Sequence, residues 1–431
     1  MSAQARQRRA HRVMKILLLN QCFWPDVVAT GQQLTMLARR LSDRGHQVTV
    51  ITSRRGYDDP AMIFPKHECL QGIEIFRISS LGLGKSSRWR RALNFGSFLL
   101  TCAGRLFLTP RQDVVVALTS PPLISWIGAV FTRLKGGKLV FWTMDINPDE
   151  AFAAGWLKAN SLTGQFLSRL LKSSLDRAAA IIALDRFMKG RIAAKDVDAA
   201  KIEVIAPALD DGVHYDEEGR EAFRQQNDLT GKFVVMYAGN HSPCNPLNTL
   251  LESAETLKTH RDLLFLFVGG GSALGSVRTF AETRGLTNIR CLPYQPYEKL
   301  AALLSSADLH VVVMGDAFKG ILHPSKIYNI LAVGSPFLFI GPDESHVSDL
   351  IAATRYTGPV MLANHGESQK VTQMIVESWQ RAASELAPAT CQLDEFDADA
   401  IYARFISVIE RAGAGSPAVA PMESPARASG G

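Results

Sequence analysis

Short apolar runs alternate with longer amphipathic runs along most of the chain, and this alternation occurs in two series. The first series has its apolar runs at 15–21, 47–53, 72–79, 113–119, 138–145 and 178–184. The second has them at 232–240, 263–271, 288–294, 308–315, 336–342 and 358–364. Apolar strands joined by amphipathic helices are typical of parallel sheets with helices on both faces. The sequence therefore predicts an α/β protein with two Rossmann-like, doubly wound domains.

Changes in composition mark the limits of these domains. Residues 205–219 are polar and rich in turn-forming residues, so they predict a linker. The start of the chain is rich in Arg, and its end is small, contains Pro and lacks periodicity. We therefore expect domains at 14–206 and 207–395, a last helix at 396–412, and disordered tails at 1–13 and 413–431.

Length and composition agree with this organisation. At 431 residues the chain is too long for one ordinary core. A hydrophobic share of 47% with 20% charged residues is typical of a globular protein. The net charge of +6 is concentrated in the Arg-rich start and in KSSRWRR at 85–91. The basic total therefore does not indicate nucleic-acid binding, and we expect no nucleic-acid partner.

Cysteine usage and hydropathy indicate the cellular compartment and whether the chain would cross a membrane. The six cysteines form no CxxC pair and have no His partner at zinc-ligand spacing, which favours reduced thiols in a cytoplasmic protein. The uncharged run 114–132 has the length of a membrane span. Pro121 and Pro122 divide it into a strand and the start of a helix, so we expect no transmembrane segment.

Ligands of doubly wound sheets bind beyond the carboxyl ends of the strands, so the loops there are the candidate sites. In the first loop Gly31 directly precedes a predicted helix, and it would let a phosphate approach free backbone N–H groups. A glycine that only begins the helix is equally compatible with this pattern.

The second domain offers three such loops. Gly239, Asn240 and His241 follow its first strand, where the polar side chains suit an anion or a sugar, although turn chemistry explains them too. Gly270 lies at the centre of three consecutive glycines after the next strand, a weak signal alone. Tyr294 and Gln295 follow the third strand, where they suit a nucleobase edge or a plain surface turn.

The stretch HPSK at 323–326 is the strongest candidate. Pro324 favours a helix start, while Ser325 supplies a hydroxyl and Lys326 a full charge, so the group suits a diphosphate without a metal. His323 adds a further polar side chain. A solvated lysine in an exposed first turn is the alternative.

Carboxylates gather at the end of one strand of the first domain. Asp145, Asp149 and Glu150 lie close together there, and Asp145 is suited to orienting a substrate hydroxyl or taking its proton. Helix capping by Asp149 is the simpler alternative for that residue. The acidic pairs at 196–198 and 397–399 lie away from strand ends, so we expect no metal site.

A basic segment leads into an apolar helix at 85–108. Trp89, Phe95 and Phe98 make this helix amphipathic, so it suits either an anionic membrane surface or the core of the first domain, the core being favoured for its apolar face.

Taken in order, these loops resemble the GT-B fold glycosyltransferases of family 4, in the branch that builds bacterial exopolysaccharides. The resemblance covers about residues 14–412, through KILLLNQCFWPD, FWTMDINPDEAFAAGWL, VVMYAGN, FVGGGS and HPSKIYNILAVGSP. It implies two domains facing across a cleft, a nucleotide-sugar donor held mainly by the second domain, a glycan or lipid-linked acceptor on the first, and retention at the anomeric carbon. It also implies that no cofactor or metal is needed and that the last helix crosses back to the first domain.

The resemblance assigns roles to individual residues. It makes Asp145 and Lys326 catalytic. The donor-binding residues are Gly31, Gly239, Asn240, His241, Gly270, Tyr294, Gln295, His323, Ser325 and Asn329. Many members carry an Arg and a Lys where this chain has Asn240 and Asn245, and two glutamates where it has Ile321 and Asn329.

These departures leave two readings of the function. We expect a cytoplasmic glycosyltransferase of exopolysaccharide biosynthesis, with a peripheral membrane contact as a candidate. A non-catalytic GT-B scaffold of a polysaccharide-assembly complex is the alternative. A nicotinamide-dependent oxidoreductase is disfavoured, because neither opening loop has GxGxxG.

Overall fold

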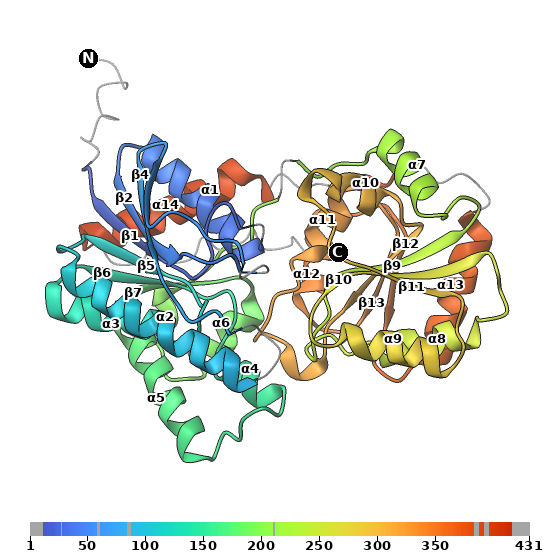
Figure 1. Ribbon diagram of the computed structural model, residues 1–431, viewed down its shortest axis with the longest axis horizontal. Coiled ribbons are helices and arrows are strands. Elements are labelled where there is room, and N and C mark those ends of the chain that lie inside the picture. The colour runs from blue at the N-terminus through green and yellow to red at the C-terminus, as the bar shows by residue number, and fades with distance from the viewer. Residues whose placement is uncertain are drawn as a thin grey trace, which may run out of the picture.

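Two sheets form the centres of two domains that lie side by side (Figure 1). The computed structural model describes residues 12–26, 28–57, 61–83, 88–209, 212–382, 388–391 and 396–415. The first sheet has eight strands, in the order β3-β4-β2-β1-β5-β6-β7-β8. The second has six, in the order β11-β10-β9-β12-β13-β14. In each the first strand is central and the chain works outward in both directions, which confirms the doubly wound prediction.

The first domain contains the early elements of the chain. Its strands are β1 (Lys15–Leu19), β2 (Gln47–Ser53), β3 (His67–Leu70), β4 (Ile73–Ile78), β5 (Val114–Ala117), β6 (Lys138–Trp142), β7 (Ala178–Ala183) and β8 (Ile202–Val204). Its helices are α1 (Ala29–Asp43), α2 (Arg88–Leu108), α3 (Ile124–Lys135), α4 (Asp149–Ala153), α5 (Leu162–Arg177), α6 (Arg186–Ala193) and the short 3₁₀ helix η2 (Ala199–Lys201).

The second domain follows after residue 212. Its strands are β9 (Phe233–Asn240), β10 (Leu263–Gly270), β11 (Ile289–Leu292), β12 (Leu309–Val313), β13 (Phe337–Ile340) and β14 (Val360–Ala363). Its helices are α7 (Glu217–Gln226), α8 (Asn248–Thr256), α9 (Leu274–Thr283), η3 (Tyr297–Lys299), α10 (Leu300–Ser305), η4 (Asp316–Phe318), α11 (Lys326–Ala332), α12 (His346–Thr354) and α13 (Ser368–Ala382).

The last helix, α14 (Ala398–Ala414), lies on the first domain (Figure 1). Its buried face carries Tyr402 and Phe405, and the Phe405 ring lies 4.3 Å from the ring of Trp142 at the end of β6. The Tyr402 hydroxyl donates to Gln33 Oε1 of α1 at 2.8 Å. The end of the chain therefore completes the core of the domain in which the chain begins.

One strand pair departs from the parallel sheets that the sequence predicts. β3 pairs with β4 in antiparallel register, from His67 opposite Phe76 to Leu70 opposite Ile73. The two residues between these strands, Gln71 and Gly72, both have positive φ, at 51° and 80°. A two-residue turn of this kind joins antiparallel strands, because its twist matches that of the hairpin.

The long uncharged run divides as predicted. β5 ends at Ala117 and α3 begins at Ile124, with the two prolines between them. Among the helices of the described residues, none has both the length and the hydropathy that a membrane crossing requires.

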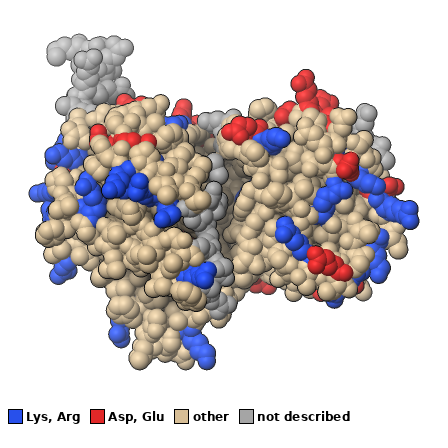
Figure 2. All heavy atoms as spheres, in the orientation of Figure 1, with Lys and Arg blue, Asp and Glu red and all other residues tan. Residues whose placement is uncertain are grey.

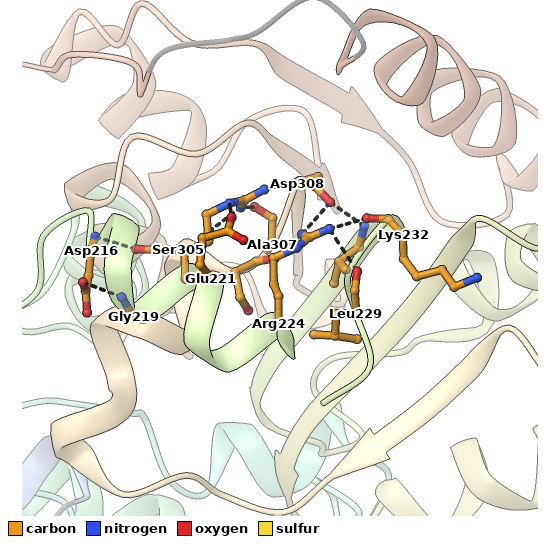
Figure 3. Close-up of polar contacts among 12 residues, drawn as sticks. Asp216, Gly219, Glu221, Arg224, Leu229, Lys232, Ser305, Ala307 and Asp308 are labelled. Carbon is orange, nitrogen blue, oxygen red and sulfur yellow. Dashed lines mark hydrogen bonds and ion pairs between the residues drawn. The ribbon is translucent and has the colours of Figure 1, made fainter. Parts of the chain in front are cut away.

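A buried charge cluster ties α7 to the sheet of the second domain (Figure 3). Asp308, just before β12, accepts from Arg220 at 2.7 Å, from Arg224 at 3.0 Å and from the backbone N–H of Val234 in β9 at 2.7 Å. The side chain of Arg224 is only 9% exposed and that of Asp308 only 16%. The cluster therefore ties together β9 and β12, the two parallel strands between which the order of strand addition reverses.

Asp308→Ala should lower the free energy of unfolding by ~3 kcal/mol or more, because the buried guanidinium of Arg224 and the partly buried one of Arg220 lose their carboxylate. Glu255→Ala, which breaks the exposed pair with Arg284 (2.9 Å), is the control and should cost less than ~1 kcal/mol. Urea denaturation of the two variants measures the difference. Equal small losses would show that the cluster does not stabilise the domain.

Candidate functional site

A buried lysine lies at the carboxyl end of β9. The Lys326 ammonium, in the first turn of α11, lies 3.6 Å from the centre of the Tyr237 ring. A side chain at Gly239 would come within 3.3 Å of it. Among the described residues no hydrogen-bond partner reaches this buried Nζ atom. Burial lowers the pKa of Lys326 to about 7.

Glycines let the loops beside this lysine pack closely. A Cβ at Gly269 would lie 2.1 Å from the Gly239 carbonyl oxygen, and one at Gly270 would lie 2.9 Å from the Tyr294 ring. A Cβ at Gly271 would lie 2.3 Å from the His241 carbonyl oxygen. The ends of β9 and β10 therefore form a surface built of backbone, with the half-exposed ring of Tyr294 against it.

His241 is buried beneath this surface, and Asn240 is exposed on it. The His241 ring is buried, and its Nδ1 lies 3.3 Å from the Gly270 carbonyl oxygen. Its Nε2 has no hydrogen-bond partner among the described residues. Burial, and then the charge of Lys326, lower the pKa of His241 to about 4, so the ring is neutral near pH 7. Asn240 is exposed, and its carbonyl oxygen accepts from the Tyr237 hydroxyl at 2.9 Å.

The first domain contributes a carboxylate cluster at the carboxyl end of β6. The Asn147 amide donates to Asp145 Oδ1 and to Glu150 Oε2, each at 3.0 Å. Burial, and then the charge of Glu150, raise the pKa of Asp145 to about 7. Glu150 also lies 3.8 Å from the Cys244 sulfur of the second domain. Asp145 therefore changes its charge close to neutral pH, at the junction of the two domains.

A segment of the second domain inserts into the first beside Asp145. Leu322 forms an antiparallel bridge with Asp145, and the Ile146 N–H donates to the Ile321 carbonyl oxygen at 3.1 Å. The Ile321 side chain is 2% exposed and belongs to the core of the first domain. Arg191 of α6 donates to the carbonyl oxygen of Lys319 at 2.6 Å. We call residues 319–322 the inserted segment.

His323, the next residue after the inserted segment, makes a buried polar contact between the domains. Its Nδ1 lies 2.8 Å from Asp185 Oδ2, and its Nε2 lies 3.0 Å from the Tyr328 hydroxyl. The His346 ring lies 4.0 Å from the His323 ring. Burial alone would raise the pKa of Asp185, but the hydrogen bond and charge of His323 outweigh it and lower this pKa.

Two family models match the chain. That of the glycosyl transferase 4-like domain matches residues 29–208, and that of the glycosyl transferases group 1 matches residues 219–323, together more than half of the chain. A protein of Escherichia coli K12 named as a colanic acid biosynthesis glycosyl transferase, WcaI, is 27% identical over 338 residues, which span 74% of this chain and 82% of that protein. The chain is a glycosyltransferase.

Further comparisons agree with this identification. A protein of Pseudomonas aeruginosa named as a glycosyltransferase, WbjE, is 24% identical over 245 residues, 57% of this chain and 61% of that protein. HepE of Anabaena, in its complex with UDP-glucose, matches with a TM-score of 0.66 at 17% identity, over 91% of this chain and 99% of that one. Sucrose-phosphate synthase of Thermosynechococcus elongatus matches with a TM-score of 0.71 at 14% identity, over 93% and 99%. The fold of the glycosyltransferase is thus GT-B.

The structure gathers most of the predicted donor-binding residues. Gly239, Asn240, His241, Gly270 and Tyr294 surround the end of β9 together with Lys326. Asn329 lies one turn further along α11.

Other predicted residues of the glycosyltransferase have different surroundings. Gly31 does not precede a helix: α1 begins at Ala29, so Gly31 lies buried in its first turn. α11 begins at Lys326, two residues after Pro324, and the exposed Ser325 is its N-cap. Gln295 turns back to donate to the Pro293 carbonyl oxygen at 3.0 Å. Both ring nitrogens of His323 already lie within hydrogen-bond distance of protein oxygens.

Three residues of the glycosyltransferase site were not selected from the sequence. Tyr237 lies within an apolar strand. The available sequence signal was that a residue with a hydroxyl group stands among aliphatic residues. Asp185 lies two residues after the end of β7 and caps α6 by accepting from the Met188 N–H at 2.7 Å. An Asp between a strand and a helix was the available signal. Cys244 gave no signal in the sequence.

Asp149, which the sequence offered as a helix cap, does not cap α4 but pairs with Lys195 at 2.7 Å.

Replacing His323 by Ala should lower the free energy of unfolding by ~3 kcal/mol, because it leaves the Asp185 carboxylate buried without its partner. The matched control is Arg186→Ala, which removes an exposed ion pair between the same domains, to Asp349 at 2.6 Å. It should cost less than ~1 kcal/mol. Urea denaturation compares them, and a small loss for His323→Ala would mean that the buried contact contributes little.

Proposed function

We propose that the protein transfers a sugar from a nucleotide-diphosphate sugar to a glycan or lipid-linked glycan, with retention at the anomeric carbon and without a metal ion. Bacterial exopolysaccharide biosynthesis is the proposed context, supported by the relative named for colanic acid biosynthesis. The donor class is supported by HepE, which was solved with UDP-glucose.

The observation that carries the proposal is the unpartnered ammonium of Lys326. A buried charge without a partner costs several kcal/mol, so proteins rarely keep one that no ligand will meet. Tyr237 compensates only in part, through its ring face. A diphosphate at the backbone surface around Gly239 would supply the missing anion. α11 has only seven residues, so we assign the charge compensation to the lysine and not to the helix dipole.

The proposed chemistry is electrostatic. The bond between the anomeric carbon and the diphosphate breaks while the acceptor hydroxyl attacks from the same face, and its proton passes to the leaving phosphate oxygen. Lys326 stabilises the charge that develops on the diphosphate. Asp145, with its pKa raised to about 7, is placed at the domain junction to orient the acceptor hydroxyl or to stabilise positive charge on the sugar.

The residues that depart from the family pattern have other functions here. Ile321, in the place of a family glutamate, packs in the core of the first domain. Asn245 donates to the Asn240 carbonyl oxygen at 3.3 Å and so shapes the loop after β9. The ribose therefore depends on groups other than a carboxylate at position 321, and Lys326 is the cation at the diphosphate.

The acceptor is proposed to bind the first domain. A cavity of about 50 Å³ opens at the carboxyl ends of its strands. Its lining includes the polar side chains of Gln21, Ser53, Arg55, Arg91 and Asn94. Two arginines suit an acceptor that carries a phosphate.

Lys326→Met should weaken UDP binding by about 30-fold or more, ~2 kcal/mol, because the diphosphate loses its buried cation. The free variant should melt no lower than the wild type, because it no longer buries an unpaired charge. Lys370→Met, which removes an exposed lysine paired with Glu367, is the control and should bind UDP normally. Isothermal titration calorimetry measures UDP binding by all three proteins, and thermal unfolding measures their stability.

The same titration tests the protonation of Lys326. In the free protein its pKa is about 7, so at pH 8 the amine is mostly neutral, and a bound anion raises that pKa. UDP binding at pH 8 should therefore take up close to one proton, visible as an enthalpy that depends on the ionisation heat of the buffer. UDP that binds Lys326→Met as tightly as the wild type would remove the lysine from the donor site.

Metal removal provides a separate test. Dialysis against EDTA should leave the turnover of a nucleotide sugar unchanged. The group best suited to a metal among the described residues is Asp185, His323 and His346, whose ligand atoms lie within 4.8 Å of one another. These residues already interact, with His323 hydrogen-bonded to Asp185. Turnover that is lost with EDTA and restored by Mg²⁺ or Mn²⁺ would contradict the proposal.

A further inference from the structure

Helix α2 has two apolar faces, and only one of them packs on the first domain. Phe98, Cys102 and Leu106, spaced four residues apart, are buried against the domain. This is the core packing that the sequence favoured. An amphipathic helix of a globular protein would carry polar residues on its other face.

The opposite face of α2 carries large apolar side chains instead. Trp89, Leu93, Leu100 and Phe107 are 59%, 48%, 76% and 79% exposed. At about 100° per residue these four positions fall within about 40° around the helix axis. They form one line along the 21-residue helix, which we call the α2 stripe. Single exposed apolar residues are common, but a continuous row marks an interaction surface.

The charge around the α2 stripe has one sign. Neither α2 nor the neighbouring α3 contains an Asp or a Glu. Both helices carry basic residues, among them Arg90, Arg91, Arg105, Arg133 and Lys135. On the face of the first domain that Figure 2 presents, Lys and Arg outnumber Asp and Glu. α2 crosses this face in Figure 1. The stripe is therefore set in an electropositive surface.

α3 extends the surface at the far end of α2. Lys135 donates to the Phe107 carbonyl oxygen at 2.6 Å, which holds the two helices together there. Leu134, beside it, is 78% exposed. The apolar and basic residues thus continue from one helix to the next.

We propose that the α2 stripe and the basic residues of α2 and α3 dock on the surface of an anionic phospholipid bilayer. Helices that lie in a membrane interface combine an apolar face, including Trp, Phe and Leu, with flanking Lys and Arg. Anionic headgroups complement the positive charge, whereas an apolar protein partner would not. The helix lies along the bilayer and does not cross it.

Docking through α2 would give the first domain a defined orientation relative to the bilayer. Arg91 and Asn94, in the first turns of α2, line the cavity at the carboxyl ends of the strands. The cavity therefore opens next to the docked helix, where the headgroup of a lipid-linked acceptor lies. Docking itself does not depend on the proposed donor chemistry.

Flotation of the full chain with lipid vesicles tests the proposal. The wild type should float with phosphatidylcholine vesicles that contain about a third phosphatidylglycerol, and not with phosphatidylcholine alone. Leu100→Gln combined with Phe107→Gln should reduce the bound fraction about tenfold, because the apolar contact is lost. Arg90→Glu combined with Arg133→Glu should reduce it similarly, and raised salt should weaken wild-type binding.

Leu362→Gln is the matched control, since this leucine is 40% exposed on the second domain. It should float as the wild type does. All variants change exposed side chains, and unaltered melting and UDP titration curves would show that fold and donor site are intact. The proposal fails if the wild type ignores anionic vesicles, or if the double glutamine variant binds them fully. It also fails if sedimentation shows a wild-type dimer that this variant abolishes, since a second copy would then cover the stripe.

Discussion

The structure depends on how one ammonium group is buried. Lys326 Nζ lies against the face of Tyr237, where water does not reach it. Burial of an ion favours its neutral form, so this amine gives up its proton far more readily than a surface lysine. In the free protein, the amine of Lys326 therefore lacks the favourable interaction that a bound anion would provide. Under the proposed function, this interaction would contribute to binding of the donor diphosphate and to stabilising it as it departs.

The glycines at the ends of β9 and β10 make this arrangement possible. A side chain at Gly269 would collide with the β9 backbone, and one at Gly270 would displace Tyr294. Positive φ at Gly239 and Gly269 further limits these positions to glycine. In the proposed donor site, a diphosphate would therefore be met by backbone and by one cation, Lys326.

Much of this could be predicted from the sequence, and the limits have physical causes. Alternating apolar and amphipathic runs predicted two doubly wound parallel sheets, because strands buried on both faces are apolar throughout. The predicted residues at the end of β9 cluster because carboxyl ends of neighbouring strands meet at one edge. The contact of His323 with Asp185 joins residues 138 positions apart in different domains, and no local pattern encodes it. The β3–β4 hairpin was missed because its signal is a two-residue turn, Gln71 and Gly72, and not a hydrophobic period.

The inserted segment, residues 319–322, has a mechanical consequence. Its backbone pairs with Asp145 and its Ile321 side chain belongs to the core of the first domain, while the chain continues within four residues to Lys326 at the sheet of the second. A change in the angle between the domains must therefore strain or shift this short tether. We therefore expect that opening of the two domains would displace the Lys326 ammonium, so that product release would accompany the loss of its charge stabilisation.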